Sequence, residues 1–271
     1  ISLDYLQWFL LACTVEVSIF AILRRSFGGS IPLAPAILAA AEAVVDQNGL
    51  SSAHATFVEE GELELFRAAG WLTRMGTQFH WQNRDYADFD GFLSALSSRK
   101  RKAIRKERAA AQSAVRIAQI SGADITPDHW DAFWVFYQDT GARKWGQPYL
   151  TRAFFDRIGE SMQDSIVLFL AYDGDLPIAG ALNFASPDCL YGRYWGCTRD
   201  VPFLHFELCY YQAIDYAIAH GLPRVEAGAQ GEHKLARGYE AVPTYSAHYI
   251  ANAGFRSAVA DFLARESQAM E

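Results

Sequence analysis

One stretch, residues 189–238, constrains the fold more than any other part of the chain. It predicts a strand at 189–196, a helix at 203–220 and a second strand at 224–229, followed by a charged loop. A strand, a helix and a strand in this order form a βαβ unit whose two strands lie parallel in one sheet. Ligands of open α/β sheets bind beyond the carboxyl ends of such strands, so the charged loop is a candidate functional site.

The boundaries of this helix are marked by several residues. Gly221, followed closely by Pro223, is a strong C-terminal stop signal. Pro202 suits the first turn, and either Asp200 or Thr198 can supply the capping side chain. Most of the helix is apolar, which indicates burial on more than one side.

Two polar residues, His205 and Glu207, stand out in the first turns of this apolar helix. Burial would raise the pKa of a carboxyl group there, whereas the helix N-terminus would lower it, and such opposing influences are common at acid/base sites. Glu207 is therefore a catalytic candidate. The alternative is a structural glutamate paired with a neighbouring Arg or Tyr.

The composition indicates a folded α/β protein with a large core. The chain has 271 residues, of which 51% are hydrophobic and 14% aromatic, enough for one large domain or two smaller ones. Its four cysteines, Cys13, Cys189, Cys197 and Cys209, show neither zinc-ligand spacing nor a disulfide framework. We therefore expect no metal site and a reducing, cytoplasmic location.

The segment 5–23 is apolar, carries one charge at Glu16 and precedes Arg24 and Arg25. Its nineteen residues are long enough to span a bilayer. A central glutamate and a strand-like alternation around it favour a buried strand or hairpin. Membrane association through this segment stays as the alternative.

The remaining pattern predicts an open mixed sheet with helices. A partial N-terminal α/β unit is expected at 1–84 and a larger domain at 85–271. The segments 165–172 and 178–184 form a hairpin, to which 189–196 adds a third antiparallel strand. Further helices are predicted at 35–47, 60–69, 88–112, 127–140 and 149–162, and further strands at 53–58, 71–81 and 115–120.

The predicted helix 88–112 carries a dense run of basic residues, with a local net charge of +6 in a chain of net charge −7. Such a run is a solvated face or the binding site of an anion, such as RNA phosphates or a pyrophosphate. No aromatic residue interrupts the run, so base readout is not implied. The anion-binding candidates are Arg99, Arg101, Lys102, Arg105 and Lys106.

The loop 141–148 places Arg143, Lys144 and Trp145 between two glycines. Glycines allow a ligand to approach the backbone closely, and a tryptophan offers a stacking face, so this loop is a candidate binding loop. A packed loop tryptophan is the alternative.

Several segments resemble the GNAT acyltransferase superfamily and, within it, the FemAB-like family of peptidoglycan biosynthesis and recognition. They are SSRKRKAIRKE (97–107), TGARKWGQPYLT (140–151), GALNF (180–184), YGRYWGC (191–197), FLHFELCYYQAIDYAI (203–218) and VEAGAQGEHKLARGY (225–239). The resemblance covers about 71–262. It implies a GNAT-like twisted mixed sheet flanked by helices, with a partial second GNAT-like unit at the N-terminus.

The resemblance also implies that the strands at 189–196 and 224–229 splay apart and admit an acyl donor. Acetyl-CoA-dependent members bind pyrophosphate on a glycine-rich turn at the helix start. Here the turn 197–202 lacks those glycines and contains Pro202, which has no N–H. FemAB-like proteins lack that turn because their donor is a charged tRNA, and their basic helices are associated with RNA or anionic precursors.

Acyl transfer to an amine needs a base and groups that hold the anionic parts of the substrates. Glu207, Glu232 and His233 are the catalytic candidates. Tyr191 or Tyr194 could face the oxyanion. The substrate-binding candidates are Arg143, Lys144, Trp145, Arg193, Tyr194, Gln230, Lys234 and Arg237. Neither a Ser-His-Asp nor a Cys-His arrangement nor a glycine-rich nucleotide loop is visible.

The sequence thus predicts a cytoplasmic acyltransferase that passes an acyl or aminoacyl group to an amine, in peptidoglycan-precursor metabolism. The expected partners are an amine-bearing small molecule or a peptidoglycan precursor, with tRNA as a further candidate and no DNA. No permanently bound cofactor is expected, and acyl-CoA or aminoacyl-tRNA would be the co-substrate. The alternative is a non-catalytic GNAT-like module that binds RNA or a peptidoglycan precursor.

Overall fold

The computed structural model describes residues 33–143 and 148–270, without the side chains of 33, 142, 143, 269 and 270. The predicted strand or anchor at 5–23 lies outside the described residues, as do Lys144 and Trp145, and of Arg143 only the backbone is described. The described residues form two compact units, one made of 33–77 with 243–270 and the other of 78–242.

The first unit is a small antiparallel sheet with helices. Its elements are α3 (Leu33–Gln47), β1 (Ser52–Val58), η1 (Glu60–Glu62), α4 (Leu63–Ala68), the first part of β2 (Leu72–Gln82), the last part of β8 (Glu240–Ile250) and α11 (Ala253–Met270). Strand β8 pairs with β1, which joins the C-terminal residues to this unit. The predicted division had instead placed them in the domain 85–271. That pairing joins residues far apart in sequence, which the local pattern does not reveal.

Two apolar clusters stabilise the first unit. Leu38 of α3 and Phe66 of α4 pack with Ala247 of β8. Val259 and Leu263 of α11 pack with Ile250. Because successive strand residues point to opposite faces, β8 contributes Ala247 to one cluster and Ile250 to the other.

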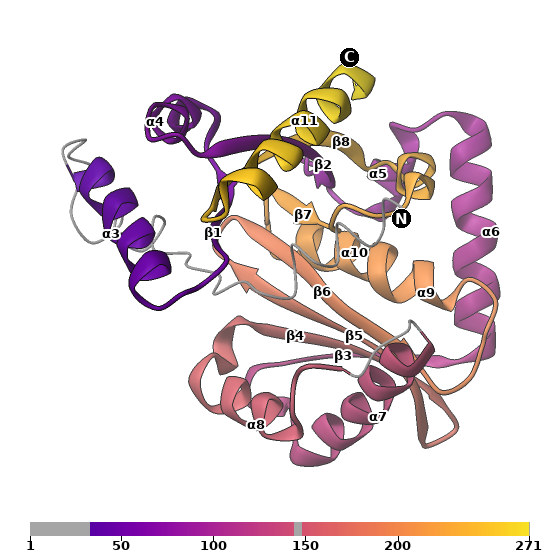
Figure 1. The fold of residues 1–271 in the computed structure, drawn as a ribbon. Coiled ribbons are helices and arrows are strands. Elements are labelled where there is room, and N and C mark those ends of the chain that lie inside the picture. The colour runs from indigo at the N-terminus through magenta and orange to yellow at the C-terminus, as the bar shows by residue number, and fades with distance from the viewer. Residues whose placement is uncertain (1–32, 144–147, 271) are drawn as a thin grey trace. The chain divides into compact units, whose positions relative to one another are not determined.

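The second unit is built on a mixed sheet in the order β2-β7-β6-β5-β4-β3 (Figure 1). Strand β3 (Arg116–Ser121) pairs antiparallel with β4 (Ile166–Asp173), β4 with β5 (Leu176–Ser186), and β5 with β6 (Cys189–Cys197). This confirms the predicted meander. Strand β7 (Arg224–Glu226) pairs parallel with β6, which confirms the βαβ unit.

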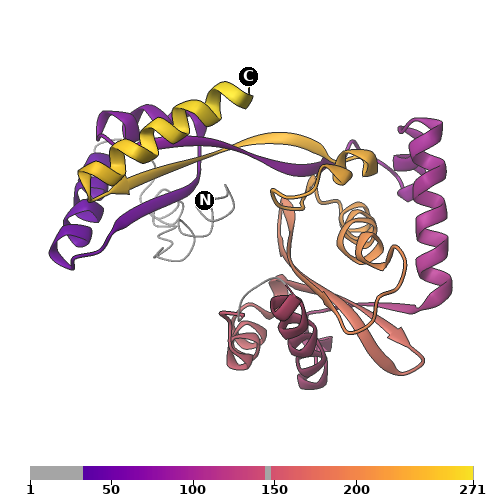
Figure 2. The same cartoon turned by 45° about the vertical axis from the view of Figure 1, so that its right-hand side comes forward.

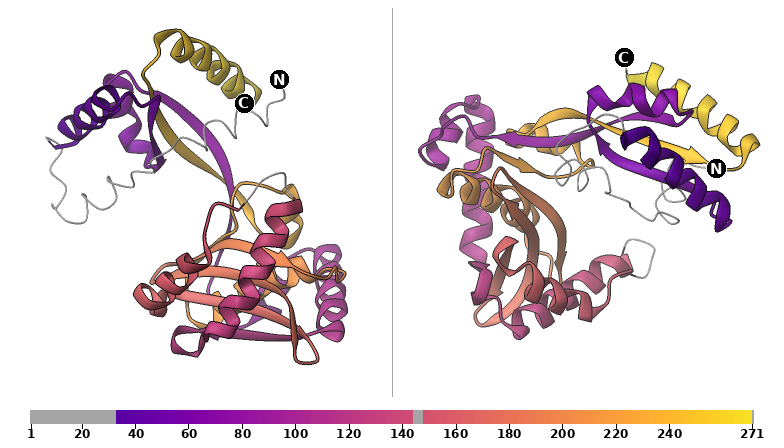
Figure 3. Two further views of the ribbon diagram at one scale, coloured as in Figure 1. Left: turned by 60° about the horizontal axis from the view of Figure 1, so that its bottom comes forward. Right: turned by 90° about the vertical axis from the view of Figure 1, so that its left-hand side faces the viewer.

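Helices cover both faces of this sheet. Phe133 of α7 (Pro127–Arg143) and Phe155 of α8 (Arg152–Ser161) pack on Leu168 of β4. Figure 3 shows α7 lying across the strands. The other face, which presents Val167 and Phe169, packs against the helix between β6 and β7 and against α6 (Ser98–Ala114). Figure 2 shows this connecting helix between the strands and α6.

The helix predicted at 88–112 is two helices, α5 (Phe89–Ser94) and α6. The side chain of Ser97 accepts a hydrogen bond from the backbone N–H of Lys100 at 3.4 Å and so caps α6. The prediction overlooked this capping signal inside a continuous polar pattern. Similarly, α8 begins at Arg152 rather than at the predicted Tyr149.

Strands β6 and β7 diverge soon after they pair. Their recorded parallel pairing joins Leu190 with Val225 and Tyr191 with Glu226, whereas β6 continues to Cys197. The predicted strand at 224–229 is therefore shorter, ending at Glu226. The short pairing agrees with the splay implied by the resemblance. Among the described residues, no helix is both long and apolar enough to cross a membrane.

Candidate functional site

The charged loop after β7 is a 3₁₀ helix, η5 (Glu232–Arg237), and Lys234 lies at its centre. The Lys234 side chain is 3% exposed. Its ammonium donates hydrogen bonds to the backbone oxygens of Ala227 at 2.6 Å, Gly228 at 3.2 Å and Gln230. Burial disfavours the charged form and lowers the pKa of Lys234 to about 8. Lys234 thus fastens the loop to the end of β7 and has no free N–H for a substrate anion.

His233 precedes this lysine and is exposed. Its Nε2 lies 3.0 Å from the hydroxyl oxygen of Tyr210. Burial, together with the charges of Arg237 and Lys234, lowers the pKa of His233, so the imidazole is neutral at pH 7. A neutral ring whose Nε2–H is donated to Tyr210 leaves Nδ1 free to accept a proton.

Gly231 allows the His233 ring to pack closely on the loop backbone. A Cβ at position 231 would lie 2.3 Å from His233 Cε1, and the backbone φ there is +99°. Only glycine suits both conditions. Glu232 and Gln230, the other polar side chains predicted here, are exposed.

Arg237 closes the loop onto α6. Its guanidinium donates to Glu107 at 2.8 Å and to the His233 backbone oxygen at 2.8 Å, and it lies 3.5 Å above the ring of Phe206. Tyr211 donates a further hydrogen bond to Glu107. Arg237 was predicted to hold a substrate anion, but its charge is already paired inside the protein.

Glu207 was predicted to be a catalytic base, and the structure places it in the core instead. Its side chain is 0% exposed. One carboxylate oxygen accepts hydrogen bonds from Arg108 at 3.2 Å, Gln112 at 2.9 Å and Gln212 at 2.8 Å. Arg108 also pairs with Asp215. Glu207 is therefore the structural glutamate of the alternative interpretation.

His205, two residues earlier, points to a different side of the helix. Residues two apart on a helix are separated by about 200°, so Glu207 faces the core while the partly exposed His205 lies among other aromatic rings. Its ring centroid is 5.2 Å from that of Trp195, 5.4 Å from that of Tyr210 and 6.3 Å from that of His233. The sequence singled out His205 but could not tell which of the two faces was buried.

The helix that carries these residues starts irregularly. It consists of α9 (Leu204–Phe206), a π-helical turn η4 (Glu207–Tyr211) and α10 (Gln212–Ala219). The residue before α9 is Phe203, with a left-handed φ of 64° and no capping side chain. The predicted caps Asp200 and Thr198 do not serve as such. Strained residues and π-helical turns occur often at functional sites.

A cavity of about 400 Å³ opens beside this irregular start. It lies at the end of β6, next to the turn that precedes α9, and Thr140 of α7 completes it. Its size is within the range of small-molecule sites. The sequence analysis identified the neighbouring turn but not the cavity, because Thr140, Trp195 and Phe206 come together only in the folded chain.

Arg193 and Tyr194 of β6 contact a different set of residues. The Arg193 guanidinium donates to the hydroxyl of Tyr149 at 3.3 Å and lies 4.7 Å above the ring of Tyr194. The hydroxyls of Tyr149 and Tyr194 are 2.5 Å apart, and Tyr194 also packs on Tyr137 of α7. These recorded contacts place the two residues with α7 rather than with η5.

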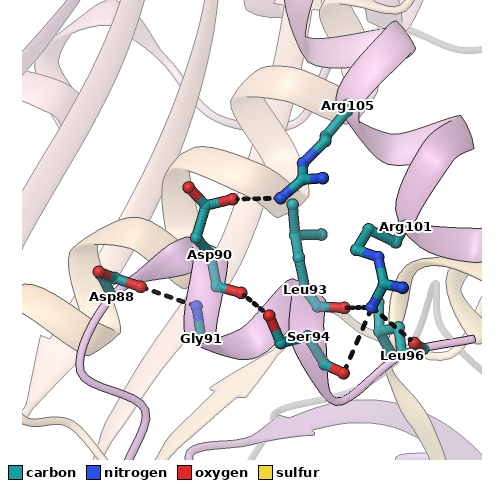
Figure 4. A network of polar contacts seen from close by, with 8 residues as sticks. All are labelled: Asp88, Asp90, Gly91, Leu93, Ser94, Leu96, Arg101 and Arg105. Atoms are coloured by element: carbon teal, nitrogen blue, oxygen red, sulfur yellow. Dashed lines mark hydrogen bonds and ion pairs between the residues drawn. The ribbon is translucent and has the colours of Figure 1, made fainter. Parts of the chain in front are cut away.

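Two of the predicted anion-binding residues instead hold α5 and α6 together (Figure 4). Arg101 donates to the backbone oxygens of Leu93, Ser94 and Leu96, each at 3.4 Å. Arg105 pairs with Asp90 at 2.8 Å. The free carbonyls at the end of α5 need donors, and this run of basic residues supplies one of them.

The remaining predicted anion-binding residues, Arg99, Lys102 and Lys106, are exposed. No ion pair of these three is recorded with any described residue. Their spacing of three and four residues places them on one stripe of α6. No cluster of three metal-ligating side chains occurs in the part of the chain that the structure describes.

Comparisons with known proteins agree with this fold. L-PGS from Bacillus licheniformis has a TM-score of 0.60 at 10% identity, covering 87% of this chain and 80% of that one. FemX has a TM-score of 0.55 at 13% identity, covering 83% and 78%. A tandem GNAT protein from the clavulanic acid biosynthesis pathway has a TM-score of 0.51 at 16% identity, covering 83% and 72%. At these identities the likeness establishes the predicted fold, a helix-flanked mixed sheet of the GNAT type.

The sequence comparisons give a family. No curated protein sequence matches the chain. The model of the FemAB-like family, described as peptidoglycan biosynthesis/recognition, matches residues 27–271. This match spans nearly the whole chain and confirms the resemblance, and the protein therefore belongs to the FemAB-like family.

Proposed function

We propose that the protein is an N-acyltransferase that passes an aminoacyl group to an amine of a peptidoglycan precursor. The observation that carries the proposal is the position of His233, a neutral imidazole on a loop fixed by Lys234 at the carboxyl end of β7. That end lies where β6 and β7 diverge, and α/β sheets bind ligands at such positions.

The proposed reaction requires a base and a fixed position for the two reacting groups. The amine nitrogen attacks the carbonyl carbon of the donor ester and forms the amide bond. His233 takes the proton that the nitrogen loses, the ester C–O bond breaks, and His233 returns this proton to the departing oxygen. Tyr210 orients the imidazole, and the Lys234 ammonium and the Arg237 guanidinium hold its loop in place.

The proposed donor is an aminoacyl-tRNA rather than an acyl-CoA. The turn before α9 offers a pyrophosphate few backbone donors, since Pro202 has no N–H, and Asp200 adds a negative charge. The stripe of Arg99, Lys102 and Lys106 on α6 suits a chain of phosphates instead. The description of the family supports a peptidoglycan precursor as acceptor.

A transfer assay tests this function. The purified protein is incubated with tRNA charged with a radiolabelled amino acid and with a set of amine-bearing peptidoglycan precursors, and acyl-CoA is supplied in a parallel series. We expect label in the precursor only with the charged tRNA. His233→Gln should reduce the rate at least about 100-fold, the usual contribution of a general base. Glu232→Gln should reduce it little, and that result would remove Glu232 from the catalytic candidates.

The pH profile gives an independent check. A base must be neutral, so the rate should rise with pH through the pKa of His233, which is lowered from its ordinary value of 6.5. The midpoint of the rise should therefore lie below pH 6.5. Transfer that is unchanged in His233→Gln would rule out the assigned base. Transfer from acyl-CoA alone would rule out the proposed donor.

One observation favours a second candidate function, a non-catalytic module that binds RNA. The cationic stripe on α6 would serve RNA binding whether or not a reaction follows. Tight, salt-sensitive binding of uncharged tRNA, with no transfer from any donor, would support this candidate over the enzyme.

A further inference from the structure

The cavity beside α9 has a wall of aromatic rings. Trp195, Phe203, His205 and Phe206 all line it. The rings of Trp195 and His205 pack edge to face, with centroids 5.2 Å apart and an interplanar angle of 71°. The ring centroids of His205 and Phe206 are 5.6 Å apart. The Arg237 guanidinium lies 3.5 Å above the ring of Phe206, so one ring of this wall already contacts a cation.

The charged groups at the cavity leave a negative charge uncompensated. Arg199 and Asp200 both line it. Arg199 pairs with Asp173 of the β4–β5 hairpin at 2.6 Å. Asp200 is exposed, does not cap α9, and has no ion pair recorded with any residue in the described ranges. The carboxylate of Asp200 is therefore available to a ligand.

We propose that this cavity binds an organic ammonium group, held between the faces of Trp195 and Phe203 with Asp200 as its counter-charge. Aromatic faces are negative and attract cations, so rings and carboxylate favour the same ligand. The same features oppose a phosphate. The three-residue helix α9 and the N–H-lacking Pro202 give a phosphate little in compensation.

The inference deepens the proposed function and rests on it for the identity of the ligand. An ammonium bound by a carboxylate keeps its proton and is a poor nucleophile, so the bound group is not the amine that reacts. Two groups fit, namely the α-ammonium of the aminoacyl donor and a second ammonium on the acceptor. The cavity would thus distinguish an aminoacyl donor from a plain acyl donor, or a diamine from a monoamine.

Binding of small probes tests the site without any reaction. Alaninamide carries an α-ammonium, and isobutyramide has the same shape with a methyl group in its place. n-Butylammonium and 1-butanol form the second pair, which represents an acceptor side chain. Each probe is titrated by calorimetry into the full chain and into three variants. The variants are Asp200→Asn, Trp195→Leu and the control Asp128→Asn, an exposed carboxylate at the opposite end of α7 from Thr140.

We expect at least one cationic probe to bind about tenfold more tightly than its neutral counterpart, a difference typical of a cation near aromatic faces. Asp200→Asn and Trp195→Leu should each weaken binding severalfold, and Asp128→Asn should not. A larger ratio of cation affinity to neutral-probe affinity for the alaninamide pair identifies the donor as the source of the ammonium, and a larger ratio for the n-butylammonium pair identifies the acceptor. If Trp195→Leu does not fold, Trp195→Phe and Asp200→Asn carry the test.

Three outcomes would overturn the inference: equal binding of cation and neutral counterpart, no binding of either cation at millimolar concentration, or cation binding that Asp200→Asn and the Trp195 variant both leave intact. The transfer assay fails or succeeds separately. A protein that binds alaninamide at this site but transfers nothing would retain the ammonium site and lose the proposed reaction. A protein that transfers the aminoacyl group but binds neither cationic probe would retain the proposed reaction and lose the ammonium site.

Discussion

The two units differ in the kind of polar side chain that they bury. The first unit holds a neutral histidine pair, in which the buried His54 of β1 faces the partly buried His248 of β8 across the two strands. The second unit also buries the uncharged Asn183 and His80, but most of its buried polar side chains are ions, namely Glu207, Lys234 and Arg237. The buried ions of the second unit surround the candidate site, whereas the histidine pair lies among strands.

The ring nitrogens of the histidine pair are satisfied by hydrogen bonds between neutral groups, and not by an ion pair. The Nδ1 atoms of His54 and His248 are 2.7 Å apart, and the Nε2 atoms contact the hydroxyls of Ser52 and Ser246, each at 2.9 Å. Only one Nδ1 can carry a hydrogen in such a contact. Burial lowers the pKa of both rings, that of His248 to about 3, with the nearby Arg74 charge adding to the effect.

The comparison teaches that the cost of a buried polar group depends on whether it needs an opposite charge. A neutral pair needs only hydrogen bonds, but it becomes unstable when a proton is added. A buried ion is stable over a wide pH range, but it depends on its partner. Variants that remove a partner and changes of pH therefore affect the two units differently.

The largest expected effect follows from removing Arg108. Arg108→Met leaves Glu207 buried without its cation and should lower the free energy of unfolding by about 3–5 kcal/mol. Lys106→Met, an exposed position on the same helix, should change it by less than about 0.5 kcal/mol. Urea denaturation measures both. If Arg108→Met with Glu207→Gln is no more stable than Arg108→Met alone, the buried charge is not the cause.

A smaller decrease in the free energy of unfolding is expected for Arg237→Lys. Lysine keeps the charge but cannot bond Glu107 and the His233 backbone together while stacking on Phe206. We expect a loss of about 2 kcal/mol, together with a changed pKa of His233, measured by denaturation and by NMR titration. Arg99→Lys is the exposed control. An unchanged His233 titration would show that Arg237 does not position the imidazole.

Acid should act on the first unit through the histidine pair. A group whose folded pKa is depressed loses its stabilising contribution as pH falls below its unfolded pKa, here 6.5 for histidine. With a folded pKa of about 3, His248 alone should lower the free energy of unfolding by about 2 kcal/mol between pH 7 and pH 5. His248→Gln should remove most of this slope. Equal slopes in the two proteins would contradict the neutral pair.

The smallest effect on stability is expected at the exposed stripe of α6. Replacing both Lys102 and Lys106 with Gln should leave the free energy of unfolding within about 0.5 kcal/mol, because neither residue has a recorded partner. The same change should lower the salt dependence of tRNA binding, with a slope about 1.5 smaller. Arg157→Gln, an exposed change on α8, is the control. Equal slopes would remove the phosphate role of the stripe.

Local pattern determined most of the elements. The turn at Gly174, the stop at Gly221 and the apolar run between β6 and β7 are signals within short stretches of chain, and the meander and the βαβ unit follow from them. The charged loop after β7 was found in the same way, since chain order alone places it at the carboxyl end of the strand.

Residue roles were decided by contacts between distant segments. His205 and Glu207 are both polar residues in one apolar helix, and only packing against α6 buries Glu207. Arg101 and Lys102 are adjacent basic residues, yet the end of α5 engages only Arg101. A charge run shows that cations are present but not which of them already have partners, since those partners lie far away in sequence.

The sequence by itself therefore determined the FemAB-like fold and the location of the polar loop, because periodicity and turn chemistry act over a few residues. Only the tertiary structure decided which groups are buried as ions and which reach solvent. It also revealed the aromatic cavity beside Asp200, whose walls come from α7, β6 and α9. The physical reason is that burial, and with it protonation and pairing, is a property of contacts that the chain makes only once it is folded.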